Sequence, residues 1–184
     1  MSEKPELDVR PHPKKTDYGI GIIGCGWVVK NYHLPAYRAR GLNVVAVADL
    51  KQEELDFVRE KFGIEKCFRD YREMLELREV EIIDLSIRAF GRVEIVEHCA
   101  EAGKHLLVQK PFARSMDEGR AMVAATNRAG VKLGVNSHYR WLNVFRGAWQ
   151  LIQQGTIGTP YYISEEMVGD QDYVYYHVML DRRW

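Results

Sequence analysis

Short apolar runs alternate with helical segments along most of the chain, and this alternation constrains the fold more than any other feature. The runs are rich in Val, Ile and Leu, and most of the helical segments end near a glycine. Strands separated by helices predict a mainly parallel sheet, because a parallel connection needs a long crossover. Right-handed crossovers place helices on both faces of such a sheet. We therefore predict an α/β fold with a doubly wound, mainly parallel sheet.

Hydrophobic periodicity and the positions of glycine set the bounds of the predicted elements. We expect strands at residues 18–23, 43–48, 67–68, 81–87, 105–108, 131–135 and 159–167. We expect helices at residues 27–40, 53–62, 71–77, 93–102, 116–129 and 142–153. Asp70 and Ser115 precede two of these helices and are expected to cap them, with Glu73 and Glu118 completing capping boxes.

The composition is that of an ordinary globular protein. The chain has 184 residues, of which 46% are apolar, enough for a core of normal size. Its 26 Lys and Arg balance 26 Asp and Glu, so it offers no support for a nucleic-acid surface or a polybasic membrane surface. No apolar run approaches the roughly 18 residues that span a bilayer. We expect neither nucleic acid nor a membrane as a partner.

The cysteines indicate the cellular compartment of the protein, and the spacing of the histidines argues against a metal site. Cys25, Cys67 and Cys99 form no CxxC pair, and an odd number of cysteines does not suit a disulfide framework. Reduced thiols predict a cytoplasmic protein. The six histidines lack HxH or HxxxH spacing, so we predict no metal site.

The strongest local motif is Gly24-Cys25-Gly26, which follows one predicted strand and opens the next predicted helix. Gly24 permits a tight turn, and Gly26 lets the backbone approach a pyrophosphate closely. The start of the helix adds free N–H groups and the positive end of the helix dipole. The motif predicts a dinucleotide site.

The three residues that follow the second glycine, Trp27, Val28 and Val29, modify this prediction. Trp27 and Val28 open the helix and are candidate cofactor-binding residues. Trp27 has two interpretations, a cover over the cofactor or a buried helix residue. Val29 stands where Gly or Ala usually allows close packing of helix on strand, which weakens the motif.

An acidic residue follows at the spacing that a dinucleotide site requires. Asp49 lies 23 residues after Gly26 and ends the second predicted strand. A carboxylate there bonds the hydroxyls of an adenosine ribose and repels a 2′-phosphate, which favours NAD over NADP. Lys51 is close enough in sequence to offset part of that repulsion, so NADP stays possible. The alternative is a simple strand–turn–helix corner with an exposed Asp.

Three stretches of the sequence resemble the Gfo/Idh/MocA oxidoreductases. They are GIIGCGWVVKNYHLPAY at 21–37, VVAVADL at 44–50 and EAGKHLLVQKPFARSMDEGRAMVAATNRAGVKLGVNSHYRW at 101–141. The resemblance extends over roughly residues 18–165. It implies a Rossmann domain followed by an α/β domain with a large open sheet. It also implies NAD(P)-dependent hydride transfer to or from a hydroxyl or carbonyl of a sugar, polyol or related small molecule.

The resemblance and the composition together suggest three parts of the chain. Residues 1–16 are rich in proline and charge and are expected to form a disordered leader. Residues 17–141 are expected to form the NAD(P)-binding Rossmann domain. Residues 142–184 are expected to begin the second domain without completing it, and homo-oligomers are expected to form through this region.

The resemblance also assigns site residues. The Glu-Lys-Pro motif of the family maps onto Gln109, Lys110 and Pro111, which makes Lys110 the candidate catalytic residue at the substrate hydroxyl. In the family the peptide bond before this proline is often cis, and Lys110–Pro111 is the candidate here. Tyr139 and Arg140 match a Tyr-Arg pair near the nicotinamide or the substrate entrance. The resemblance makes both of them, together with Gln109, Lys110 and Pro111, candidate cofactor-binding residues.

Some residues depart from the family pattern. Gln109 replaces the glutamate, and the Thr-Pro-Asn that lines the dinucleotide reads Ile87, Arg88 and Ala89. Ile87 and Arg88 are kept as candidate cofactor-binding residues. Arg88 could bind a phosphate or a substrate carboxylate, or lie on the surface. The histidine downstream of that motif is replaced by Arg92.

Two histidines at family positions are expected to have structural and not catalytic roles. His33 and His105 are expected to be packing or hydrogen-bonding residues. The Asp and His that complete the family's catalytic group lie in its second domain, and the nearest local pair is His177 and Asp181 in reverse order. We interpret that pair as a surface or interface pair.

These departures leave other functions open. Without the Asp and His segment, the chain could be a non-catalytic dinucleotide-binding module. A methyltransferase that binds S-adenosylmethionine also carries a glycine turn and a strand-end acid, but the Lys110–Pro111 block argues against it.

Overall fold

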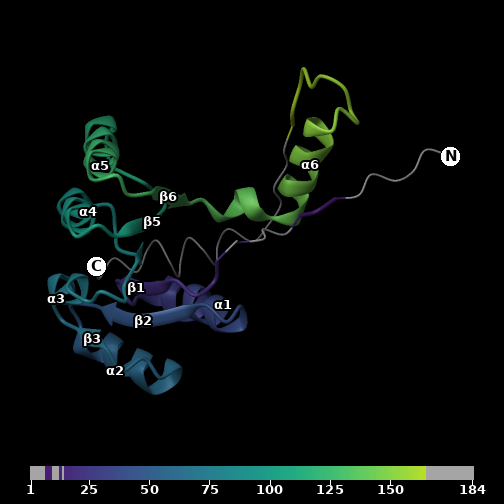
Figure 1. Ribbon diagram of the computed structural model, residues 1–184. Coiled ribbons are helices and arrows are strands. Elements are labelled where there is room, and N and C mark those ends of the chain that lie inside the picture. The colour runs from purple at the N-terminus through teal and green to yellow at the C-terminus, as the bar shows by residue number, and fades with distance from the viewer. Residues whose placement is uncertain (1–6, 10–12, 14, 165–184) are drawn as a thin grey trace, which may run out of the picture. The chain divides into compact units, whose positions relative to one another are not determined.

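The computed structural model describes residues 7–9, 13 and 15–164 of the chain (Figure 1). The strands are β1 (Gly19–Ile23), β2 (Asn43–Ala48), β3 (Cys67–Phe68), β4 (Ile82–Leu85), β5 (His105–Gln109) and β6 (Leu133–Asn136). The helices are η1 (Val29–His33, a π-helix), α1 (Leu34–Ala39), α2 (Gln52–Phe62), α3 (Tyr71–Leu75), α4 (Arg92–Glu101), α5 (Met116–Ala129), η2 (His138–Trp141, a 3₁₀-helix) and α6 (Asn143–Gln153).

The six strands form one parallel sheet in the order β3-β2-β1-β4-β5-β6. The chain first builds outward from β1 to β3 and then returns to pair β4 against the other side of β1. This is the order of a doubly wound Rossmann sheet. The predicted fold class is confirmed.

Each face of the sheet carries its own apolar core, because alternate side chains of a strand point to opposite faces. On one face, Ile20 and Ile22 of β1 pack with residues from η1, α1 and α2. On the other face, Ile83 and Leu85 of β4 pack with residues from α3, α4 and α5. Helices therefore cover both faces of the sheet, as predicted for a doubly wound fold (Figure 1).

The described residues fall into two compact units. The larger unit runs from residue 10 to 142 and contains the whole sheet. The smaller unit contains α6 together with residues 7–9. Within it, a Cβ on Gly147 would lie 3.6 Å from a methyl of Leu7, and Gln150 donates a hydrogen bond to the Asp8 carbonyl. These contacts tie residues 7–9 to α6.

Two predicted elements differ from the structure. The predicted helix 27–40 widens into the π-turn of η1, where the Leu34 N–H bonds the carbonyl five residues back, and then continues as α1. The strand predicted at 159–167 is wrong over its described part. Residues 159–164 are exposed and pair with no strand, and an extended segment without a partner gains no ladder hydrogen bonds. Residues 165–167 lie outside the described residues.

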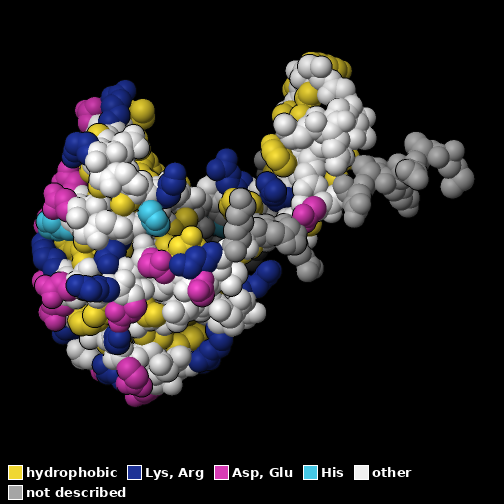
Figure 2. Space-filling model, viewed as in Figure 1, with side chains coloured by type: hydrophobic (Ala, Val, Ile, Leu, Met, Phe, Trp, Pro, Cys, Tyr) yellow, Lys and Arg dark blue, Asp and Glu magenta, His cyan; other side chains and the backbone are white. Residues whose placement is uncertain are grey.

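The surface of the larger unit mixes both signs of charge. Figure 2 shows Lys and Arg side chains interspersed with Asp and Glu over the visible face, in keeping with the balanced composition of the sequence. Across the described residues, no helix is both long enough and apolar enough to cross a membrane.

Candidate functional site

The order of the strands reverses at β1 and β4, and ligands of such sheets bind beyond the carboxyl ends of the strands at this point. β1 and β4 pair in register from Ile20↔Ile82 to Ile23↔Leu85. Four connections leave this edge close together, the glycine turn after β1 and the segments after β2, β4 and β5. They contain most of the predicted site residues.

The glycine turn after β1 uses its two glycines in different ways. The Gly24 N–H donates to the Ala48 carbonyl at 2.8 Å, and its φ is +91°. A Cβ on Gly24 would lie 2.7 Å from the Ser86 carbonyl oxygen, so the fold itself requires glycine here. A Cβ on Gly26 would have nothing within 4 Å. The packing of the described residues therefore does not require glycine at 26, and the space beside it is open.

Asp49 lies at the end of β2 and is bonded to the glycine turn. Its Oδ2 accepts the Cys25 N–H at 2.7 Å, and its Oδ1 accepts the Lys51 N–H at 2.8 Å. Each carboxylate oxygen has a second lone pair, so both can accept a further hydrogen bond from a ligand. Because the side chain is held by two backbone donors, it is already oriented before any ligand binds.

The start of the following helix is open to solvent. Trp27 is 48% exposed and packs edge-on against Tyr32, with ring centroids 5.3 Å apart, so the interpretation of Trp27 as a buried helix residue is wrong. Val28 is also exposed, whereas Val29 is buried beneath the helix. The first turn of η1 contains no acidic side chain of its own to oppose an anion.

These features fit a dinucleotide. The turn offers a glycine with open space beside it, a helix start free of acidic residues, and an oriented carboxylate across the β1–β2 corner. Pyrophosphate, helix N–H groups and ribose hydroxyls are complementary to that donor and acceptor set.

Lys110 follows β5, and its backbone is tightly held. The Lys110–Pro111 peptide bond is cis, which confirms the prediction. The Lys110 N–H donates to Oε1 of the preceding Gln109 at 2.7 Å. The Lys110 side chain is exposed. A fixed backbone therefore presents a free ammonium group at the carboxyl edge of the sheet.

Arg92 holds the same loop from the interior. Its side chain is 1% exposed, and Nη1 donates to the carbonyls of Gln109 at 2.7 Å and Phe112 at 3.0 Å, and also to that of Pro111. Nη2 donates to the carbonyl of Ile87, after β4. Burial lowers the pKa of this guanidinium. One buried cation thus joins the loops that follow β4 and β5.

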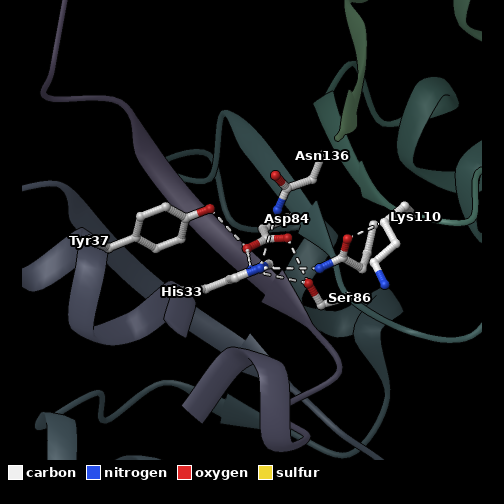
Figure 3. A network of polar contacts seen from close by, with 7 residues as sticks. His33, Tyr37, Asp84, Ser86, Lys110 and Asn136 are labelled. Atoms are coloured by element: carbon white, nitrogen blue, oxygen red, sulfur yellow. Dashed lines mark hydrogen bonds and ion pairs between the residues drawn. The ribbon is translucent and has the colours of Figure 1, made fainter. Parts of the chain in front are cut away.

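A polar network lies beneath this edge, on the sheet face that η1 and α1 cover (Figure 3). Asp84 on β4 is 1% exposed and accepts three hydrogen bonds, from His33 Nδ1 at 2.7 Å, Tyr37 at 2.9 Å and Ser86 at 2.9 Å. Burial, and then the neighbouring carboxylate, raises the pKa of the Tyr37 hydroxyl, which keeps its proton. The buried charge is fully satisfied.

The network extends from His33 to the strand ends. Nε2 of His33 lies 3.4 Å from Nε2 of Gln109 and 3.2 Å from Nδ2 of Asn136. Gln109 and Asn136 are paired neighbours in the β5–β6 register. His33 is therefore a hydrogen-bonding residue, as expected, and so is His105, whose Nδ1 accepts the Lys132 N–H at 3.1 Å.

Other predicted residues lie nearby or apart. Ile87 borders the glycine turn, 2.8 Å from where a Gly24 Cβ would stand, and Arg88 is exposed just after it. Tyr139 and Arg140 lie exposed in η2 after β6, where Tyr139 packs against His138. In the described part of the chain, no hydrogen bond or ion pair joins these two residues to the loops after β1, β2, β4 and β5. His177 and Asp181 lie outside the described residues.

Sequence reasoning missed several residues of this network. Asp84 carried a signal, because a lone acid inside the apolar run EIIDLSI needs buried partners. Tyr37, Ser86 and Asn136 carried none, since their contacts depend on which strands become neighbours. Arg92 was noted as a departure from the family pattern, but its bonds to four carbonyls were not foreseen.

The comparisons with known proteins agree with this geometry. The model of an oxidoreductase family with an NAD-binding Rossmann fold matches residues 18–137. D-apiose dehydrogenase of Paraburkholderia graminis is 38% identical over 142 residues, covering 77% of this chain and 38% of that protein. Myo-inositol 2-dehydrogenase of Thermotoga maritima is 27% identical, covering 77% of this chain and 42% of that protein. The chain therefore spans well under half the length of these relatives.

Solved structures give the same result. An oxidoreductase from Agrobacterium radiobacter, in complex with NAD⁺, L-tartaric acid and magnesium, superposes with a TM-score of 0.74 at 26% identity, covering 79% of this chain and 43% of that one. An NAD-binding oxidoreductase from Klebsiella pneumoniae gives a TM-score of 0.73 at 29% identity, covering 78% and 40%. The fold, the glycine turn and the family match together place this chain in the Gfo/Idh/MocA oxidoreductase family, with its NAD-binding Rossmann fold.

Proposed function

We propose that this chain binds NAD(H) at the glycine turn and takes part in hydride transfer to or from a small polyhydroxylated molecule. The observation that carries the proposal is Gly26, whose side is open although the fold does not need a glycine there. A residue without a side chain at such a position leaves room for a pyrophosphate against the backbone.

Asp49 would select the cofactor. Its oxygens each keep a lone pair for a ribose hydroxyl, and its charge would repel a 2′-phosphate. We therefore propose NAD as the preferred cofactor, with NADP as a weaker ligand. Trp27, Val28, Ile87 and Arg88 would border the cofactor, because all four follow β1 or β4 at the carboxyl edge of the sheet.

Lys110 would serve the substrate. A bound nicotinamide supplies or accepts the hydride. In the reduction direction the exposed Lys110 ammonium would sit beside the substrate oxygen, stabilise its developing negative charge and donate a proton to it. In the oxidation direction the neutral Lys110 amine would accept the proton of the substrate hydroxyl. Gln109 and Pro111 would fix the backbone from which the lysine reaches. Tyr139 and Arg140 would border the nicotinamide or the substrate entrance.

The relatives indicate the class of substrate. Their names include a D-apiose dehydrogenase and a myo-inositol 2-dehydrogenase, a sugar and a cyclic polyol. We propose a substrate of this kind. We further propose a cytoplasmic location, which the three free cysteines support, and self-association through the C-terminal region. Gel filtration with light scattering tests the self-association.

Two measurements on the 184-residue chain test the proposed function separately. A tryptophan fluorescence titration with NADH tests binding, and a folded protein that leaves the fluorescence unchanged at saturating NADH would contradict it. Formation of NADH from NAD⁺ with D-apiose or myo-inositol tests catalysis, with Lys110→Ala as the inactive control. Binding without turnover would leave the second candidate, a non-catalytic dinucleotide-binding module, which Gln109 in place of the family's glutamate favours.

A further inference from the structure

The peptide between Gln109 and Lys110 is held at both of its polar atoms. Its carbonyl oxygen accepts a hydrogen bond from Arg92 at 2.7 Å, and its N–H donates to Gln109 Oε1 at 2.7 Å. The first contact comes from a side chain that is 1% exposed. The second depends on which way round the Gln109 amide points, so the orientation of this amide controls the Lys110 backbone.

His33 determines the orientation of the Gln109 amide, because one of its ring nitrogens donates a hydrogen bond and the other accepts one. Nδ1 lies 2.7 Å from the Asp84 carboxylate, so this nitrogen carries the proton. In the neutral ring Nε2 then has only a lone pair to offer, and it needs a donor. The amide nitrogens of Gln109 and Asn136 approach Nε2 at 3.4 and 3.2 Å and supply that donor.

The Gln109 amide has one oxygen and one NH₂ group. With its NH₂ turned to His33, its oxygen faces the Lys110 N–H. The reversed amide would set donor against donor at Lys110 and acceptor against acceptor at His33. The reversed orientation is therefore disfavoured at both contacts.

We propose that His33 and Asp84 are positioning residues that act on Lys110 through Gln109. Asp84 fixes the His33 tautomer, His33 fixes the Gln109 amide, and the amide oxygen fixes the peptide that carries the lysine (Figure 3). The consequence for catalysis rests on the proposed role of Lys110, whereas the positioning itself does not.

The proposal also explains why glutamine suits position 109. A glutamate carboxylate has no N–H to give to Nε2 of a neutral His33, so it would set acceptor against acceptor at this contact and favour a second proton on the ring. Gln109 satisfies His33 and Lys110 at once while the ring stays neutral. The departure from the family's Glu-Lys-Pro motif is thus matched to the hydrogen-bonding role of a residue 76 positions away.

Nitrogen-15 NMR of the histidine rings in the full chain tests the first step. We expect His33 to be the neutral tautomer protonated at Nδ1, and Gln109→Glu to give a ring protonated on both nitrogens. A wild-type His33 protonated at Nε2 would overturn the proposal, and so would a neutral ring in a folded Gln109→Glu variant.

Hydrogen exchange at the Lys110 amide tests the second step. His33→Asn keeps a donor for Asp84 but is too short to reach Gln109, whereas His33→Gln can reach Gln109. We expect exchange at Lys110 to accelerate about three- to tenfold in His33→Asn, the loss of one hydrogen bond, and to stay closer to wild type in His33→Gln. A role in packing alone would affect both variants alike.

His98→Ala is the matched control, since His98 bonds Tyr71 on the far side of the sheet and does not touch Gln109. Equal exchange at Lys110 in folded wild type and His33→Asn would overturn the proposal. These readouts need neither cofactor nor substrate. A chain that fails to bind NADH would therefore contradict the proposed function and leave this test intact.

Discussion

The turn after β1 and the loop after β5 lie at the same edge of the sheet but are held in shape by different means. Gly24 and its neighbours are fixed by backbone contacts and by the Asp49 carboxylate, one corner away. The loop that carries Lys110 is fixed by side chains from η1, β4 and α4. The turn leaves space beside the backbone, whereas the loop holds the backbone of Lys110 in place.

The difference corresponds to two tasks, binding a ligand at the turn and positioning Lys110 at the loop. A phosphate site needs open backbone N–H groups, and glycine provides them locally. A catalytic lysine needs a rigid backbone, and here buried polar side chains provide the rigidity from a distance. Changes at the turn should therefore affect ligand affinity, and changes around the loop should affect stability and the placement of Lys110.

Removing Arg92 should have the largest effect. Arg92→Leu leaves four carbonyls without their buried donor, and we expect a loss of about 3 kcal/mol or more in the free energy of unfolding. Urea unfolding followed by circular dichroism measures it. Arg128→Ala, at an exposed position of α5, is the control and should change stability by less than about 0.5 kcal/mol. Equal stability of the two variants would contradict the role given to Arg92.

Gly24→Ala should have the next largest effect, this time on the turn. A Cβ there meets the Ser86 carbonyl at 2.7 Å and the backbone has a φ of +91°. We expect a loss of about 1–3 kcal/mol in the free energy of unfolding. Thermal unfolding checks it, and a melting temperature equal to that of wild type would show that the turn is not constrained as described.

Asp49→Asn should change cofactor preference more than stability. The amide oxygen can still accept one backbone N–H, while the charge that opposes a 2′-phosphate is removed. We expect the ratio of NADH to NADPH affinity to fall about tenfold, or about 1.4 kcal/mol, in isothermal titrations of both cofactors. An unchanged ratio would assign cofactor choice to another residue.

The smallest expected effect is a difference in labelling rate among the three cysteines. Burial, and then the Asp49 charge, raises the pKa of the Cys25 thiol within the glycine turn, and burial raises the pKa of Cys99 to about 12. Burial also raises the pKa of Cys67, which is less enclosed. A raised pKa keeps the thiol protonated and unreactive. Iodoacetamide labelling followed by mass spectrometry should therefore modify Cys67 first, and faster as pH rises. Rapid labelling of Cys25 in folded protein would contradict the burial of this turn.

The same contrast explains what could be predicted from sequence. The bounds of β2, β3 and α5 match the prediction, because each is a short pattern with its own end signals, such as Ser115, whose hydroxyl accepts the Glu118 N–H. Asp70 likewise caps α3 through the Arg72 N–H. The π-turn of η1 leaves no mark in the sequence. The strand expected at 159–167 had the alternation of a strand, but its described residues, 159–164, pair with no strand.

The residues of the candidate site also fall into those that a sequence pattern predicts and those that it does not. Gly24, Gly26 and Asp49 could be found because their chemistry is local and their spacing is regular. The contacts of His33 with Asp84 and Gln109 join residues 51 and 76 positions apart. Only the strand order brings them together, and a sequence pattern does not encode that order directly.

The most direct test is the variant Gly26→Ala. A methyl at Gly26 would have no described residue within 4 Å, so we predict an unchanged free energy of unfolding. The same methyl intrudes where the pyrophosphate would lie, so the Kd for NADH should rise at least about tenfold in an isothermal titration. A variant with wild-type stability and wild-type affinity for NADH would contradict the assignment of this turn as the dinucleotide site.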